Sequence, residues 1–140
     1  MAEVSVSRRL AASRPTVARE LDPRTIVELE GTFEVADVTE TDDGWLVEAT
    51  APGMRAEFAV REFEEGDRSG YVYEQVGERG PFAAMRTRLS LEPASDGTTV
   101  TAESTVDLGL PAKVVTDRIA GWKRRGELRR VLDGLESAVA

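Results

Sequence analysis

The chain has 140 residues, no cysteine and no histidine, and a net charge of −8 at neutral pH. The length is that of one domain over residues 1–140, and 41% hydrophobic residues suffice for a core. The two missing residue types exclude disulfides, thiolate metal sites and the nucleophile systems that use Cys or His, and the acidic balance argues against nucleic acid as a partner.

We expect no metal and no cofactor. We also expect no integral membrane association, because no apolar run approaches the roughly 20 residues of a membrane span. The first ten residues lack the build of a signal peptide, so a cytoplasmic location is expected. Basic residues are 16 Arg and only 2 Lys. This composition favours either a salt-loving source or a GC-rich genome, and both interpretations stay open.

The chain opens with one strand and two short helices. Residues 3–10 alternate between apolar and polar side chains, which predicts a strand. Ser13 suits a helix N-cap with Pro15 in the first turn, and Asp22-Pro23 interrupts this helix. A second short helix is expected over residues 24–30, ending at Gly31.

Six strand-like runs follow, separated by short turns such as Asp42-Asp43-Gly44 and a charged turn over residues 64–69. Short connections favour antiparallel neighbours. The strands are expected over residues 32–41, 45–50, 54–61, 70–76, 82–91 and 98–108.

A long amphipathic helix is expected from Pro111 to Val139, roughly 40 Å at ~1.5 Å per residue. Its first apolar stripe is Val115, Ile119 and Trp122, and a second follows over residues 128–139. We expect the first stripe and Gly126 to face the sheet. The predicted fold class is α+β: a seven-stranded antiparallel sheet curled around the C-terminal helix, with two short helices between strands 1 and 2.

Four segments, taken in order, resemble the helix-grip fold of the START-like superfamily, also called SRPBCC, which includes lipid-transfer domains, polyketide cyclases and coenzyme-Q-binding proteins. These segments lie at residues 4–23, 80–82, 89–100 and 127–136. The resemblance implies a module that binds or carries a hydrophobic small molecule, such as a lipid, an isoprenoid or a quinone, in a cavity between sheet and C-terminal helix. No cyclase constellation carries over, so no catalytic residue is assigned.

Nine residues are candidates to line such a cavity, because the periodicity places them on or beside inward faces: Arg8, Phe58, Val60, Tyr73, Met85, Leu89, Ile119, Trp122 and Gly126. The apolar members serve equally well as plain core. A buried Arg8 requires an anion, either a ligand carboxylate or phosphate or an internal carboxylate such as Glu62. Alternatively, Arg8 lies at an edge position where its guanidinium reaches water. Gly126 either leaves room for a ligand or lets the helix bend, or else it packs closely against a bulky residue such as Trp45 or marks a kink without a functional role.

Two other functions remain open: a cyclase-type or dehydratase-type enzyme that works without histidine, and a protein-interaction module with a filled core. An enclosed apolar cavity above ~300 Å³ favours binding or catalysis, and a filled interior favours interaction. The basic residues of the last helix either dock an anionic partner or membrane surface, or form a solvated face paired with Glu127, Asp133 and Glu136. The sequence does not reveal the oligomeric state.

Overall fold

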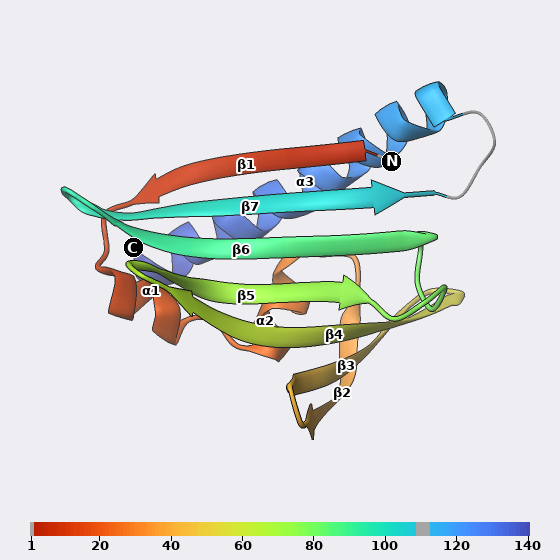
Figure 1. Ribbon diagram of the computed structural model, residues 1–140, viewed down its shortest axis with the longest axis horizontal. Helices are drawn as coiled ribbons and strands as arrows, with labels where there is room; N and C mark the ends of the chain where they lie inside the picture. Colours follow the sequence, from red (N-terminus) through yellow and green to blue (C-terminus); the bar gives the residue numbers. More distant parts are fainter. Residues whose placement is uncertain (1, 109–112) are drawn as a thin grey trace.

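The computed structural model describes residues 2–108 and 113–140, with the side chains of the last helix described from residue 118 onward. Seven strands form one antiparallel sheet in the order β1-β7-β6-β5-β4-β3-β2 (Figure 1). The strands are β1 (Ala2–Leu10), β2 (Glu34–Thr41), β3 (Gly44–Ala51), β4 (Met54–Glu65), β5 (Arg68–Gln75), β6 (Ala84–Ala94) and β7 (Gly97–Asp107). The helices are α1 (Arg14–Arg19), α2 (Pro23–Leu29) and α3 (Lys113–Val139). The predicted α+β helix-grip arrangement is confirmed.

Each short helix begins at a side-chain cap. The Ser13 hydroxyl accepts a hydrogen bond from the Thr16 amide at 3.4 Å, and the Asp22 carboxylate accepts one from the Thr25 amide at 2.8 Å. A proline follows each cap, where its fixed φ suits the first turn. Helix α1 ends at Arg19 with Glu20 as its C-terminal cap, and Asp22-Pro23 starts α2.

The hairpin between β4 and β5 is longer than the sequence predicted. The predicted charged turn over residues 64–69 is wrong at both ends, because Glu64 and Glu65 continue β4 and pair with Ser69 and Arg68. The turn itself is short and uses Gly66 at φ 59°, a value that favours glycine. Glu65 and Arg68, the last residue pair of the two strands, carry opposite charges, and such a cross-strand pair stabilises the extended hairpin.

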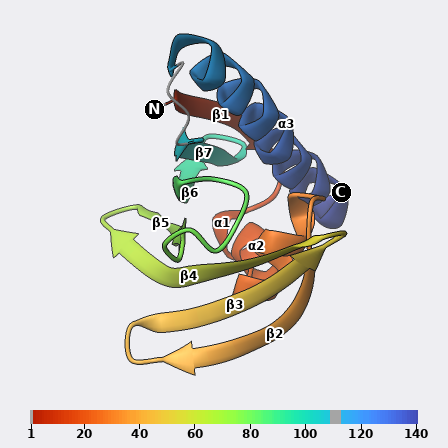
Figure 2. The ribbon, with the colours of Figure 1, turned by 90° about the vertical axis from the view of Figure 1, so that its right-hand side faces the viewer.

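The helices cover the concave face of the curled sheet in two groups. Helix α3 packs along β1 and β7, and α2 packs against β2 and β3 (Figure 2). Buried apolar side chains from both layers form one core, among them Val17, Ile26, Val47, Phe58 and Leu128. None of the helices in the described part of the chain has the length and apolarity needed to cross a membrane.

Helix α3 turns a different face to the sheet from the one predicted. Ile119 is 54% exposed and Trp122 is 79% exposed, so the prediction that they face inward is wrong. Steps of four residues back from buried Leu128 lead to Arg124 and Ala120, which are both buried. Because the buried stripe contains Arg124, it is not recognised as apolar in the sequence. The prediction therefore chose the neighbouring apolar residues Ile119 and Trp122. Pro111 and the side chain of Val115 lie outside the described residues.

Candidate functional site

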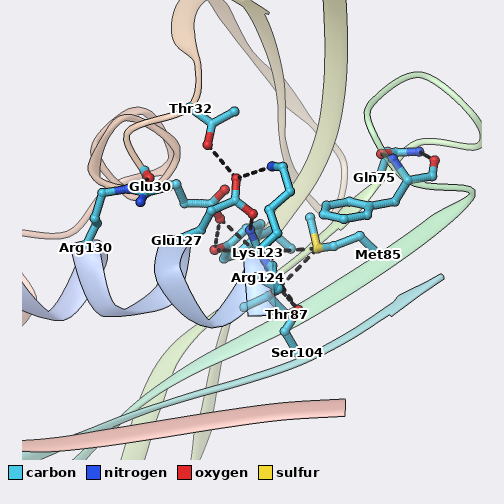
Figure 3. Close-up of polar contacts among 12 residues, drawn as sticks. Glu30, Thr32, Gln75, Met85, Thr87, Ser104, Lys123, Arg124, Glu127 and Arg130 are labelled. Atoms are coloured by element: carbon cyan, nitrogen blue, oxygen red, sulfur yellow. Dashed lines mark hydrogen bonds and ion pairs between the residues drawn. The ribbon is translucent and has the colours of Figure 1, made fainter. Parts of the chain in front are cut away.

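A buried arginine stands at the centre of the concave face. Arg124 projects from α3 into the molecule with 1% of its side chain exposed (Figure 3). Its guanidinium Nη2 lies 2.8 Å from the Glu30 carboxylate, and Nη1 donates to the Glu127 carboxylate at 3.1 Å. Nη2 also donates to the Thr87 hydroxyl at 2.7 Å, and Nε donates to the Ser104 hydroxyl at 3.1 Å. The guanidinium therefore joins α3 to α2, β6 and β7.

Tyr73 of β5 completes this cluster. Its hydroxyl donates to the Glu30 carboxylate and accepts a hydrogen bond from Arg124 Nη2 at 3.2 Å. Glu30 is the C-terminal cap of α2, and its backbone carbonyl accepts a further bond from Arg130 Nε at 2.6 Å. Tyr73 and Glu30 are each 2% exposed. We call Glu30, Tyr73, Arg124 and Glu127 the Arg124 cluster.

Glu127 connects the cluster to the beginning of β2. The Thr32 hydroxyl donates to its carboxylate at 2.5 Å, and the Lys123 ammonium lies 3.3 Å from the same oxygen. The Lys123 ammonium also lies 5.7 Å from the centre of the Phe82 ring. Figure 3 shows Thr32 and Lys123 approaching Glu127 from the same side. These contacts close the space between α3 and the loop that precedes β6.

Charge compensation shifts the pKa of three groups in the cluster. Burial alone would lower the pKa of Arg124, but the Glu30 carboxylate, with Tyr73 and Glu127, raises it overall. Burial alone would raise the pKa of Glu127, but the Arg124 guanidinium and the Thr32 and Lys123 donors lower it. Burial and then the Glu30 carboxylate raise the pKa of Tyr73 well above 10, against the opposing effect of Arg124.

The charges and hydrogen-bond donors of the cluster are satisfied within the protein. Two carboxylates, Glu30 and Glu127, face two cations, Arg124 and Lys123, so the charges balance. Every nitrogen of the Arg124 guanidinium has an acceptor. With Glu30, Tyr73 and Arg124 almost fully buried, the cluster offers no face to a ligand.

Five of the predicted cavity residues come together around this cluster. Phe58, Val60, Tyr73, Met85 and Leu89 are each at most 3% exposed and belong to one packed core. The Phe58 and Tyr73 rings pack edge to face at 6.5 Å, and the Thr87 hydroxyl lies 3.1 Å from the Met85 sulfur. Packed side chains thus fill the centre of the concave face.

The other predicted residues lie away from this centre. Arg8 on edge strand β1 donates to Asp133 of α3 at 2.6 Å, so the expectation of an ion pair holds with a different partner from the predicted Glu62. A Cβ added to Gly126 would lie 3.7 Å from Arg130 Nη1. The suggested packing of Gly126 against Trp45 is wrong, and Ile119 and Trp122 point to solvent.

Sequence reasoning missed Arg124, Glu30 and Glu127 as interior residues, because it grouped Arg124 with a solvated basic stretch. One signal was present: Arg124 and Glu127 continue the helical spacing of Leu128, Val131 and Leu135. A charge of each sign inside an apolar stripe indicates a buried pair.

A groove of about 500 Å³ opens at the end of the β3–β4 hairpin. Ala49 and Ala56, paired across β3 and β4 and each 1% exposed, contribute to its lining. Met54, which is 41% exposed, lies in the same groove together with Arg55 and Arg79. Small side chains at the strand pair and a long apolar side chain beside them leave space that a ligand can enter.

The loop between β5 and β6 forms one wall of this groove and is held in place by Gln75. The Gln75 amide donates to the carbonyls of Gly77 at 2.8 Å and Phe82 at 2.6 Å, and accepts from the Phe82 amide at 3.2 Å. Arg79 of the same loop binds both carboxylate oxygens of Glu57, at 2.9 and 3.0 Å. These contacts fix the position of the loop that lines the groove.

Several solved structures share the overall fold over nearly the whole chain. A STAR-related lipid transfer protein from Xanthomonas axonopodis aligns with a TM-score of 0.63 and 17% identity, over 94% of this chain and 84% of that one. A START superfamily protein from Mycobacterium smegmatis aligns with a TM-score of 0.65 and 16% identity, over 98% and 96%. The protein XoxI from Bacillus cereus aligns with a TM-score of 0.71 and 15% identity, over 99% and 96%.

No protein-family model matches the sequence, and comparison with curated proteins finds no match. The structural matches confirm the resemblance noted from the sequence: the chain has the START-like helix-grip fold. At these identities the likeness concerns the fold.

Proposed function

We propose that this protein binds a small apolar molecule of the lipid, isoprenoid or quinone type in the groove at the end of the β3–β4 hairpin. The observation that carries the proposal is the groove itself, whose volume of about 500 Å³ is typical of small-molecule sites. The solved protein from Xanthomonas axonopodis is described as a lipid transfer protein, and its similar fold supports this class of ligand.

The lining of the groove is mixed, and we infer that it suits a molecule with an apolar body and a polar end. Its charged members are Glu48, Arg55, Glu57, Glu78 and Arg79. Ala49, Ala56 and Met54 offer apolar contact, and Arg55 offers a guanidinium for a carbonyl or carboxylate oxygen. The Arg79 guanidinium is already paired with Glu57, so Arg55 is the better cation for the polar end.

Native mass spectrometry of protein purified from its own host, followed by titration with a fatty acid, an isoprenoid alcohol and a quinone, tests the proposal. Met54→Glu places a charge on an exposed position of the groove and should weaken binding by about tenfold or more. Ala59→Glu is the matched control, because Ala59 is exposed on the same strand and does not line the groove. The proposal fails if no compound binds, or if Met54→Glu binds as tightly as the control.

A protein-interaction module with a filled core is the second candidate, and the Arg124 cluster favours it by occupying the centre of the concave face. Hydrogen exchange separates the two candidates. Protection of residues 49–57 and 77–82 by a compound of the panel supports the groove as a binding site. If no compound changes the hydrogen exchange of these residues, the protein-interaction module is the better-supported function.

A further inference from the structure

The outer face of α3 carries an apolar ridge that is unusual for a charged helix. Trp122 is 79% exposed and Ile119, three residues before it, is 54% exposed. Residues three apart are neighbours on a helix surface, so the two side chains form one patch. The opposite face of α3, with Ala120, Arg124 and Leu128, is buried, and the ridge therefore points away from the sheet.

Arginines surround this ridge. Arg118 lies four residues before Trp122, and Arg125 and Arg129 lie three and seven residues after it, so all four share one side of the helix. All three arginines are exposed. Neither Arg125 nor Arg129 forms an ion pair with another residue that the structure describes.

Arginines on the other side of the molecule behave differently. Arg9 pairs with Asp96 at 3.0 Å, and Arg79 pairs with Glu57 at 2.9 Å. The three acidic residues expected as partners are paired with other groups: Glu127 is buried against Arg124, and Asp133 and Glu136, which follow Arg129 on the same side of the helix, pair with Arg8. Between residues 118 and 129 the outer face of α3 thus carries a local excess of positive charge, on a chain whose net charge is −8.

We propose that the outer face of α3, formed by Arg118, Ile119, Trp122, Arg125 and Arg129, docks the protein on an anionic lipid bilayer. Tryptophan favours the headgroup region, and arginines beside it bind lipid phosphates and respond to negative surface charge. Screening confines the repulsion from distant acidic residues to about 8 Å at physiological salt, so the local excess dominates at contact. α3 lies along one side of the molecule, where a flat surface can approach it (Figure 2). This inference is independent of the groove.

Co-sedimentation with vesicles measures the docking directly. The protein should bind vesicles of phosphatidylcholine mixed with phosphatidylserine and should bind pure phosphatidylcholine vesicles weakly. Arg125→Glu/Arg129→Glu should lower the partition coefficient by about 25-fold or more, from roughly fivefold for each cationic residue lost. Arg19→Glu/Arg24→Glu is the matched control, because both residues are exposed on α1 and α2 and the net charge changes equally. The control double variant should retain most of the binding.

A second measurement uses Trp122 itself. The chain has two tryptophans, so Trp45→Phe leaves Trp122 as the single tryptophan, which can be excited selectively over the two tyrosines. Its emission should shift to the blue with mixed vesicles and stay unchanged with pure phosphatidylcholine. Met54→Glu should bind vesicles normally, which separates this inference from failure of the proposed groove.

Three results overturn the inference. The first is absence of binding to mixed vesicles. The second is equal loss of binding in both charge-reversal variants, which would indicate a general charge effect. The third is a concentration-dependent dimer without vesicles that Trp122→Ala abolishes, because a second copy of the chain would then be the occupant of this face.

Discussion

The Arg124 guanidinium of α3 lies 2.8 Å from the Glu30 carboxylate at the end of α2, and neither side chain is more than 2% exposed. The two helices are far apart in the sequence, and this ion pair fixes how they meet beneath the sheet. A buried pair contributes little net stability against an apolar replacement, but the loss of one partner leaves the other charge unpaired. The Arg124 cluster therefore determines the phase of α3 on the sheet.

Replacing Arg124 with methionine should destabilise the protein by about 3–5 kcal/mol, because Glu30 and Glu127 would remain buried without their guanidinium. Chemical denaturation monitored by circular dichroism measures this loss. Arg125→Met on the exposed face of the same helix is the control and should stay within about 0.5 kcal/mol of the parent. Equal effects of the two substitutions would contradict the importance of the buried pair.

Glu127 gives the cluster a dependence on acid pH. Its pKa is lowered in the folded protein, mainly by Arg124 against the effect of burial, from an ordinary value of 4.5. Because the folded state takes up the proton less readily, the contribution of Glu127 is complete above pH 4.5 and is lost as the pH falls through the folded pKa.

The thermal midpoint should therefore fall more steeply below about pH 5 in the parent than in Glu127→Gln, which has no proton to gain there. Differential scanning calorimetry at several pH values gives both slopes. Glu103→Gln, which changes an exposed carboxylate of β7, should follow the slope of the parent. Parallel slopes for the parent and Glu127→Gln would show that Glu127 is not held ionised by the cluster.

Both tyrosines of the chain should resist ionisation in the folded state. Burial, followed by Glu62 and Asp22, raises the pKa of Tyr71 to about 12. Burial and Glu30 raise the pKa of Tyr73 well above 10. A folded pKa above the unfolded one means that this contribution to stability is complete below pH 10 and declines as the pH rises further.

Ultraviolet absorbance should show little tyrosinate in the folded protein near pH 11, and a complete transition near pH 10 in denaturant. Tyr71→Phe should remove the first transition of the folded protein, near pH 12. A full tyrosinate signal near pH 10 in the folded protein would mean that the two hydroxyls are open to solvent.

Local sequence pattern predicted the strands, the caps of the short helices and the order of elements. These features depend on residues that are close together in the sequence, such as alternating apolar residues and turn residues. Ser13 and Asp22 could be recognised from the side chain and the proline beside it. The orientation of α3 could not be predicted from the sequence, because it depends on the contact between Arg124 and Glu30. These two residues are far apart in the sequence and meet only in the folded chain.

The candidate groove was likewise absent from the sequence prediction. Nothing in the sequence distinguishes Ala49 and Ala56 from other strand residues. They become neighbours only through the pairing of β3 with β4. The large side chains that suggested a cavity, such as Phe58 and Tyr73, pack against one another and fill the centre. Large side chains fill space and small ones leave it open, so the choice of large residues pointed to the packed core and not to the groove.

Gly126 should tolerate a methyl group. Glycine inside a helix costs about 1 kcal/mol relative to alanine, and a Cβ here would meet only Arg130 Nη1, at an ordinary 3.7 Å. Gly126→Ala should therefore raise the free energy of unfolding by about 0.5–1 kcal/mol, measured by denaturation. Gly70→Ala is the contrasting variant and should destabilise, because Gly70 has φ 155° and a Cβ there would overlap the Leu89 carbonyl oxygen. Loss of stability in Gly126→Ala would instead indicate that α3 needs the flexibility of glycine at this position.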